Sequence, residues 1–253
     1  MRDQARLQRD YYAATAHNYD AIHVSEGDEH SVGLRYASAI MRELEVQSLL
    51  DVGTGTGRAV GYFRRKHAGV LVVGVEPVLA LLAHARAKPD IAGAHLASAS
   101  GYRLPFRSAS FDAVCQFGIL HHVKDPSSVV AEMMRVAKRA IFLSDSNRFG
   151  QGTLPSRLIK LLLFQCRLWP LANLLKTGGS GYTVSEGDGV SYSYSVFDSL
   201  DVLQRWSERV ILVPTGRPDY PNWCSPLLTS SHVLLCAVRG ELRGVENYLA
   251  VRR

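Results

Sequence analysis

Residues 48–60 read SLLDVGTGTGRAV, an apolar run that ends in three glycines at alternating positions and continues into a basic stretch. Glycine adopts positive φ values and lets a backbone approach another group closely. A turn of this kind joins a buried strand to a helix whose N-terminus faces a ligand. The candidate ligands are a dinucleotide, a triphosphate or another adenosine-bearing cofactor.

Short apolar runs alternate with helical patterns downstream of this turn, which predicts a parallel sheet with helices on both faces. Right-handed crossovers place the carboxyl ends of its strands on one edge. The expected strands are 48–53, 70–76, 91–98, 111–118, 139–145, 209–214 and 231–239, and the expected helices are 58–66, 78–88, 127–138 and 196–206.

Residues 148–195 interrupt the alternation with an amphipathic run and two glycine clusters, TGGSG and EGDG. A loop this long inside a compact domain is usually functional. We therefore expect one domain over residues 1–253, with 148–195 as an inserted substrate cap over the ligand edge. Residues 1–47, helical from about 30 to 44, are expected to form an N-terminal helical lid.

The net charge of +6 is spread along the chain. Residues 1–150 carry 18 basic and 15 acidic side chains, and residues 151–253 carry 11 and 8, so no basic patch predicts a nucleic-acid partner. No run of about 18 apolar residues predicts a membrane span.

The four cysteines, Cys115, Cys166, Cys224 and Cys236, form no CxxC pair and no zinc-type spacing with histidine. We expect no metal ligands and a reducing, cytoplasmic location. The N-terminal sequence MRDQARLQRDYY lacks the apolar core of a signal peptide.

The glycine turn excludes two of the three ligands. A triphosphate loop requires GxxxxGK[ST], and this turn has no such lysine. The dinucleotide fingerprint GxGxxG requires glycine where Arg58 stands. Asp51, which ends the preceding strand, suits instead a cofactor that carries an ammonium group near the turn.

Three segments in order resemble the class I S-adenosylmethionine-dependent methyltransferases, in particular the group that acts on small molecules. They are LLDVGTGTG, VVGVEP and YRLPFRSASFDAVCQFGILHHV, within residues 49–123. The resemblance covers roughly residues 11–145, with weaker support to 239. It implies a doubly wound, Rossmann-like, mostly parallel seven-stranded sheet with an antiparallel last strand and a helical cap. It also implies S-adenosylmethionine as cofactor and S-adenosylhomocysteine (SAH) as product.

The resemblance implies roles for individual residues. Glu76, 19 residues after Gly57, is expected to accept hydrogen bonds from the ribose hydroxyls, although an acid complementing a helix dipole is an alternative. Asp51 is expected to face the methionine ammonium. The family commonly has an acid near the adenine where this chain has Ser100. The expected cofactor set is Tyr19, Asp51, Gly53, Thr54, Gly55, Gly57, Glu76, Pro77, Ser100, Gly101 and Phe117.

His121 and His122 follow the fourth expected strand and are the candidates for a catalytic base. In the family, the LHHV segment commonly serves packing and cofactor contacts, so both interpretations stay open.

On the acceptor side, Asp145 and Asn147 end the fifth strand, and we expect either to orient a substrate hydroxyl or amine. Tyr192 and Tyr194 share a face if extended, which suits a ring-bearing acceptor, but hairpin packing explains them equally.

The apolar segment 156–176 has three interpretations: a cap over an apolar substrate, a dimer face, or a membrane-surface helix. We expect methyl transfer to a small, partly hydrophobic molecule at oxygen, with nitrogen or carbon as alternatives. An RNA methyltransferase and a non-catalytic S-adenosylmethionine-binding protein are the alternative functions. A homodimer is one expected assembly.

Overall fold

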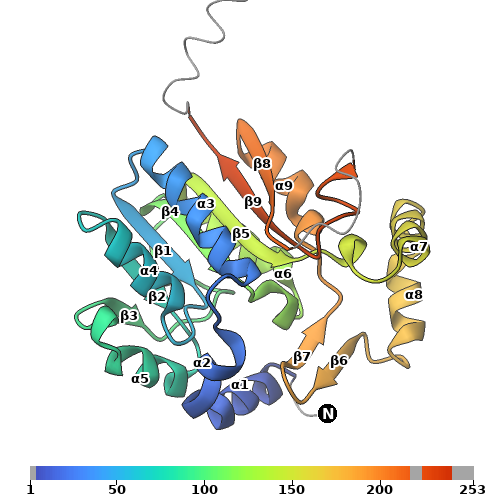
Figure 1. Cartoon of the computed structure of the whole chain (residues 1–253), viewed down its shortest axis with the longest axis horizontal. Coiled ribbons are helices and arrows are strands. Elements are labelled where there is room, and N and C mark those ends of the chain that lie inside the picture. The colour runs from blue at the N-terminus through green and yellow to red at the C-terminus, as the bar shows by residue number, and fades with distance from the viewer. Residues whose placement is uncertain (1–3, 217–223, 241–253) are drawn as a thin grey trace, which may run out of the picture.

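A seven-stranded sheet in the order β3-β2-β1-β4-β5-β9-β8 forms the centre of the protein in the computed structural model, which describes residues 4–216 and 224–240 (Figure 1). Five strands pair in parallel: β1 (Ser48–Val52), β2 (Leu71–Val75), β3 (His95–Ala97), β4 (Phe111–Phe117) and β5 (Ala137–Ser146). β9 (His232–Val238) runs antiparallel to β5 and to β8 (Arg209–Pro214). The expected fold class is confirmed, including the antiparallel last strand.

Helices cover both faces of the sheet because neighbouring strand residues point to opposite sides. Leu49 belongs to a buried cluster with Phe63, on the face covered by α3 and α4. Leu50 belongs to a second cluster with Met133, on the face covered by α6 and α9. These helices are α3 (Glu29–Glu43), α4 (Arg58–Lys66), α6 (Pro126–Val136) and α9 (Leu200–Trp206), and α5 (Leu79–Ala87) follows β2.

Two segments outside the alternating core lie over the edge where β1, β4 and β5 end (Figure 1). One holds α1 (Gln4–Thr15) and α2 (Tyr19–His23), and the other holds α7 (Leu154–Gln165), α8 (Trp169–Lys176), β6 (Tyr182–Ser185) and β7 (Gly189–Tyr192). Gln8 of α1 accepts a hydrogen bond from the Val190 amide and donates one to the Asp188 carbonyl at 3.2 Å. The N-terminal helix is therefore fastened to the β6–β7 hairpin.

Most expected elements agree with the structure to within a few residues. The third strand is shorter than expected, because residues Pro89–Ile91 form a 3₁₀ turn and Gly93 adopts a positive φ of 72° before β3 begins. The helix expected over 196–206 begins with a separate 3₁₀ turn, Val196–Ser199. Residues 1–3, 217–223 and 241–253 of the expected domain lie outside the described residues. Among the described residues, no helix has the length and apolar character needed to cross a membrane.

Candidate active site

The glycine turn is buried at Gly55, which lies under the Tyr19 ring and lines two cavities. A Cβ atom on Gly53 would lie 2.6 Å from Ile119 Cγ2, so this position packs against the chain. At Gly55 the nearest atom to an added Cβ is the Tyr19 hydroxyl oxygen, at 3.8 Å. Both residues have positive φ, 73° and 55°, which favours glycine. The turn therefore needs glycine for conformation at both positions and for packing at Gly53.

Glu76 follows β2 and is 6% exposed. Its Oε2 accepts a hydrogen bond from the Gly55 amide at 3.1 Å, and its Oε1 accepts one from the Val78 amide at 2.9 Å. Burial raises the pKa of Glu76 to about 7, against the opposing effect of these amides. Each carboxylate oxygen has a second lone pair, so the ionised form can also accept hydrogen bonds from a ligand.

Asp51 ends β1 and is also buried. Its Oδ1 faces the Cys115 thiol at 3.6 Å, whereas its Oδ2 has no hydrogen-bond partner among the described residues. Burial raises the pKa of Asp51 to about 6. A buried carboxylate oxygen without a partner is costly unless a donor or cation meets it, which suits the ammonium group of the expected cofactor.

Two adjoining cavities lie against these residues. The first, of about 380 Å³, is lined by Tyr19, Gly53, Gly55, Glu76, Pro77, Ser100 and Gly101 of the expected cofactor set. The second, of about 240 Å³, is lined by Tyr19, Asp51, Gly53, Thr54, Gly55 and Phe117 of that set. Gly57 lines neither, because it begins α4 and packs against Ile91. Ser100 Oγ accepts a hydrogen bond from the Tyr102 amide at 3.3 Å. The residues present thus fit the expected cofactor.

Two tyrosines of the N-terminal segment cover this region. The Tyr12 and Tyr19 rings pack edge to face with centroids 5.7 Å apart, and both line the two cavities. Burial raises the pKa of Tyr19 to about 12, so its phenol is neutral at physiological pH. Tyr12 and Tyr19 therefore pack against each other within the N-terminal segment and also line the cavities beside the glycine turn.

His121 is held by a buried carboxylate. Its Nδ1 lies 2.7 Å from Oδ1 of Asp145, which is 0% exposed and also accepts a hydrogen bond from the Leu120 amide at 2.9 Å. Burial alone would lower the pKa of His121, but Asp145 and Asp188 raise it to about 10. A histidine that is protonated at neutral pH cannot take a proton from an acceptor, so this arrangement favours a cationic His121 over a free base.

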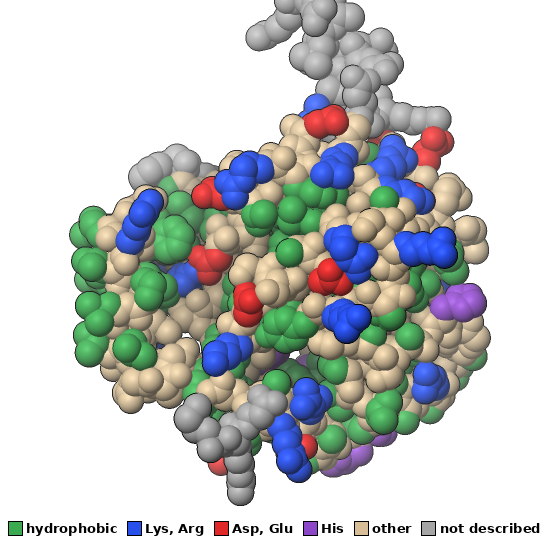
Figure 2. All heavy atoms as spheres, turned by 180° about the vertical axis from the view of Figure 1, so that it is seen from behind, with side chains coloured by type: hydrophobic (Ala, Val, Ile, Leu, Met, Phe, Trp, Pro, Cys, Tyr) green, Lys and Arg blue, Asp and Glu red, His purple; other side chains and the backbone are tan. Residues whose placement is uncertain are grey.

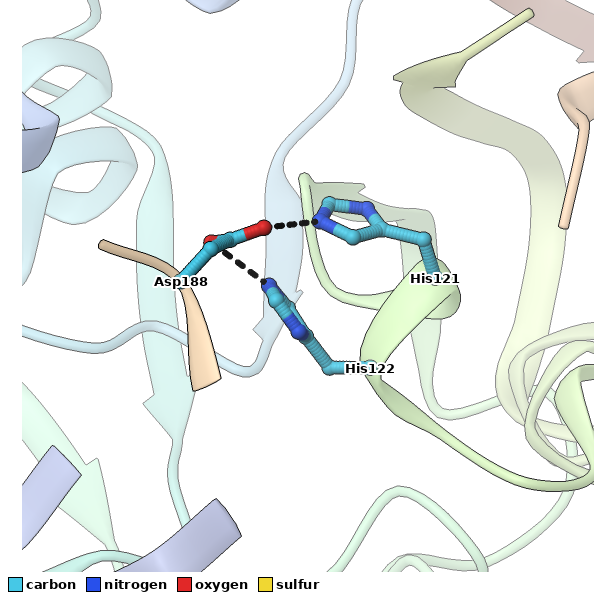
Figure 3. A group of neighbouring side chains, drawn as sticks. All are labelled: His121, His122 and Asp188. Carbon is cyan, nitrogen blue, oxygen red and sulfur yellow. Dashed lines mark ion pairs between the residues drawn. The ribbon is translucent and has the colours of Figure 1, made fainter. Parts of the chain in front are cut away.

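His122 and Asp188 complete the cluster with His121 (Figure 3). His122 Nδ1 lies 2.8 Å from the Val190 carbonyl oxygen, and its Nε2 lies 3.3 Å from Asp188 Oδ1. Asp188 belongs to the turn between β6 and β7. Burial would raise the pKa of its carboxyl, but the two histidines hold it well below the usual range. Asp188 was not expected from the sequence, because its only local signal was a glycine-flanked turn, EGDG.

A third cavity of about 360 Å³ lies under the insertion and shares His121 and Asp188 with the second. Its lining is polar and basic, with Arg148, Lys160 and Lys176 among its residues. Burial lowers the pKa of Lys160, and the neighbouring cations lower it further.

The apolar side chains of α7 and α8 largely face outward and do not form the roof of an apolar chamber. Figure 2 shows apolar side chains gathered at the left of the molecule, the side on which these helices lie. The exposed ones in this segment are Leu154, Leu158, Ile159, Leu162, Phe164, Leu168, Leu171, Leu174 and Leu175.

The structure corrects part of the expected acceptor set. Asn147 is 0% exposed, and its Nδ2 donates to the Leu227 and Ser230 carbonyls at 2.7 and 2.8 Å. The prediction that it faces the acceptor is therefore wrong. Asp145 is equally buried and reaches the site only through His121.

The two expected tyrosines differ in their surroundings. The Tyr194 hydroxyl pairs with Ser199 Oγ at 2.8 Å, and its ring is 5% exposed. Tyr192 is less buried, lines the first and third cavities, and donates to Gln4 Oε1 at 3.2 Å. Tyr192 therefore has the more accessible side chain.

Sequence comparisons match the segment that holds the parallel strands β1 to β5 to known proteins. A family model described as a methyltransferase domain matches residues 50–142. An uncharacterized methyltransferase of Mycobacterium sp. (strain KMS) is 36% identical over 92 residues, which are 36% of this chain and 35% of that protein. Another from Schizosaccharomyces pombe is 33% identical over 99 residues, 36% of each chain. The chain thus matches about a third of the length of these relatives.

Solved structures show the same fold over almost the whole chain. Magnesium protoporphyrin IX methyltransferase from Synechocystis PCC 6803, with bound SAH, aligns with this chain at a TM-score of 0.60 and 17% sequence identity. The alignment covers 94% of this chain and 100% of the other. A SAM-dependent methyltransferase from Thermotoga maritima, a possible histamine N-methyltransferase, has a TM-score of 0.59 at 16% identity and covers 91% and 99%.

Proposed function

We propose that this chain, whose residues 50–142 match a methyltransferase domain, is a class I S-adenosylmethionine-dependent enzyme that methylates a small molecule at an oxygen atom. The observation that carries the proposal is the buried Glu76 carboxylate beside Gly55, which lines two cavities, with Asp51 Oδ2, which has no hydrogen-bond partner among the described residues, near the same turn. Glu76 would accept the ribose hydroxyls, and Asp51 would meet the methionine ammonium. When bound, the cofactor supplies an electrophilic methyl group.

The position and protonation of His121 support oxygen as the methylated atom. His121 lines both the second cavity and the cavity under the insertion, so it stands between cofactor and acceptor sides. A positive charge beside an acceptor hydroxyl stabilises its ionised form. We therefore propose an acceptor hydroxyl that ionises readily, of the phenol or enol type.

The remainder of the acceptor is inferred from the cavity under the insertion. Lys160 and Lys176 line it, and neither has a carboxylate partner among the described residues. Trp169 and Tyr192 line it with their aromatic rings. A small, partly hydrophobic molecule with a ring and a separate carboxylate or phosphate would match this lining. A cytosolic location is part of the proposal, since the four cysteines are free.

Two measurements test the function separately. Isothermal titration should show SAH and S-adenosylmethionine binding in a Glu76-dependent way, with no binding of NADH. Transfer of a radiolabelled methyl group should then favour hydroxyaryl carboxylates or phosphates over aryl amines and over total RNA. Binding without transfer to any class would indicate a non-catalytic binding protein, and preferential labelling of RNA would refute the small-molecule proposal.

A further inference from the structure

Three potential metal ligands converge between the cofactor and acceptor sides of the site. We propose that His121, His122 and Asp188 bind one divalent transition-metal ion (Figure 3). Their ligand atoms all lie within 4.8 Å of one another. The two histidines come from the 3₁₀ turn Leu120–His122 after β4, and the carboxylate comes from the β6–β7 turn. The site therefore forms only when the insertion folds over the sheet edge.

The surroundings of both histidines leave the ligating nitrogens free. His121 Nδ1 faces the Asp145 carboxylate at 2.7 Å, and His122 Nδ1 faces the Val190 carbonyl at 2.8 Å. Because a carbonyl or an ionised carboxylate only accepts, each Nδ1 carries a proton, and Gln8 Nε2 lies 3.2 Å from the same His122 nitrogen. A metal ion would displace the second proton of His121 from Nε2, so that each Nε2 offers it a lone pair. Metal-binding histidines almost always have such a carboxylate or carbonyl partner on the other ring nitrogen.

The distances to Asp188 fit ligands that share an ion better than direct hydrogen bonds. His122 Nε2 lies 3.3 Å from Asp188 Oδ1, and His121 Nε2 lies 3.6 Å from Asp188 Oδ2. Charge-assisted hydrogen bonds are shorter, about 2.7–2.9 Å. Ligand atoms bound tetrahedrally to one ion at 2.0–2.2 Å are roughly 3.3–3.6 Å apart. The two observed separations fall in that range, and they involve both oxygens of the Asp188 carboxylate, Oδ1 facing His122 and Oδ2 facing His121.

The charges and ligand types select the class of ion. With neutral imidazoles, Asp145 and Asp188 leave the cluster with an excess of negative charge, which a divalent cation would balance. Two imidazoles favour zinc, iron, cobalt or nickel over magnesium and calcium, which prefer oxygen ligands. Three protein ligands leave a coordination position open. His121 and Asp188 line both adjoining cavities, so an acceptor oxygen could occupy that position.

Metal binding is tested directly on the full chain. After treatment with a chelator and its removal, Co²⁺ titration should give a visible d–d absorption band that saturates at one ion per chain, and Zn²⁺ should displace it. Asp188→Asn and His122→Gln should each weaken Co²⁺ binding by more than tenfold. Asp145→Asn, which alters the partner of His121 Nδ1 and an acceptor of the Leu120 and Ser146 amides, should weaken it by about 10–100-fold.

The control is His17→Gln, because His17 is exposed in the turn after α1 and lines none of the three cavities. It should bind Co²⁺ like the parent chain. SAH affinity, measured on the same metal-free samples, separates this inference from the proposed function. Two results would overturn the metal site: no saturable absorption band, or unchanged Co²⁺ binding in both Asp188→Asn and His122→Gln. Either result would identify the cluster as an ion-pair network, whatever the SAH affinity.

Discussion

Replacing Glu76 by glutamine removes the charge that we expect to bind the cofactor ribose while almost preserving the side-chain volume. The carboxylate now accepts the Gly55 and Val78 amides, one on each oxygen. Two ribose hydroxyls would add two charge-assisted hydrogen bonds, and the charge of the acceptor contributes about 1–1.5 kcal/mol to each. Their loss predicts about 2–3 kcal/mol weaker SAH binding, or roughly a 30–150-fold higher Kd.

The same substitution has a second, opposite consequence for the chain without cofactor. Because burial raises the pKa of Glu76 to about 7, an ionised Glu76 at pH 8 costs folding free energy. Glutamine removes that cost but turns an NH₂ group toward one of the two backbone amides. We therefore expect cofactor affinity to fall steeply while the apparent Tm at pH 8 changes little.

Isothermal titration of SAH at pH 8, paired with thermal denaturation, separates the two effects. Asp201→Asn is the matched control, since Asp201 is an exposed acid in the first turn of α9 and lines none of the three cavities. It should leave the Kd unchanged. A Glu76→Gln affinity within threefold of the parent, in a folded protein, would refute the assignment of Glu76 to the ribose.

The remaining predictions concern pH, packing and the acceptor. SAH affinity should increase from pH 6 to pH 8, because roughly one in ten Glu76 carboxyls is ionised at pH 6 and nine in ten at pH 8; titration at both values checks this, and Glu76→Gln should not show it. Without cofactor, the raised pKa of Glu76 means that the folded chain binds more protons than the unfolded chain between about pH 4.5 and pH 7. The free energy of unfolding should therefore fall by up to about 3 kcal/mol as the pH rises through that window. Urea denaturation of the parent and of Glu76→Gln across this pH range measures the difference. Asn147→Ala should lower the free energy of unfolding by about 2–4 kcal/mol, because buried carbonyls lose their donor, and SAH affinity should change little. A variant of unchanged stability with a raised KM for the acceptor would instead place Asn147 in the acceptor site. Lys176→Gln should raise the KM for an anionic acceptor several-fold and leave that for an uncharged analogue unchanged, as steady-state kinetics would show.

The parts of the site that the sequence predicted depend on local patterns. A strand, a glycine turn and a helix within residues 48–66 determine where Asp51 and Gly55 lie relative to the sheet. The next strand then carries Glu76 to the same edge, because parallel neighbours end together. Periodicity and crossover handedness suffice for such inferences, so the sequence could place Asp51, Gly55 and Glu76 at one edge of the sheet.

Asn147 and Asp188 show where local patterns were insufficient. A polar residue at the end of a parallel strand usually faces the ligand edge, but Asn147 instead holds the carbonyls of the segment that precedes β9. That segment is far away in sequence, and no periodicity relates the two. Asp188 reaches His122 only because α1 fastens the β6–β7 hairpin through Gln8. Long-range packing of this kind leaves no signal in a local window.

The predicted and unpredicted site residues come from different segments of the chain. Glu76 and Asp51 lie within residues 50–142, the segment that matches the methyltransferase domain. Asp188, Lys160 and Lys176 come from the insertion outside it. The shared segment therefore builds the cofactor side, and the insertion supplies both the carboxylate beside the two histidines and the cations of the acceptor cavity. Changes at Lys160 and Lys176 should consequently alter acceptor choice while leaving SAH binding near that of the parent chain, because these two residues line the third cavity and neither of the first two.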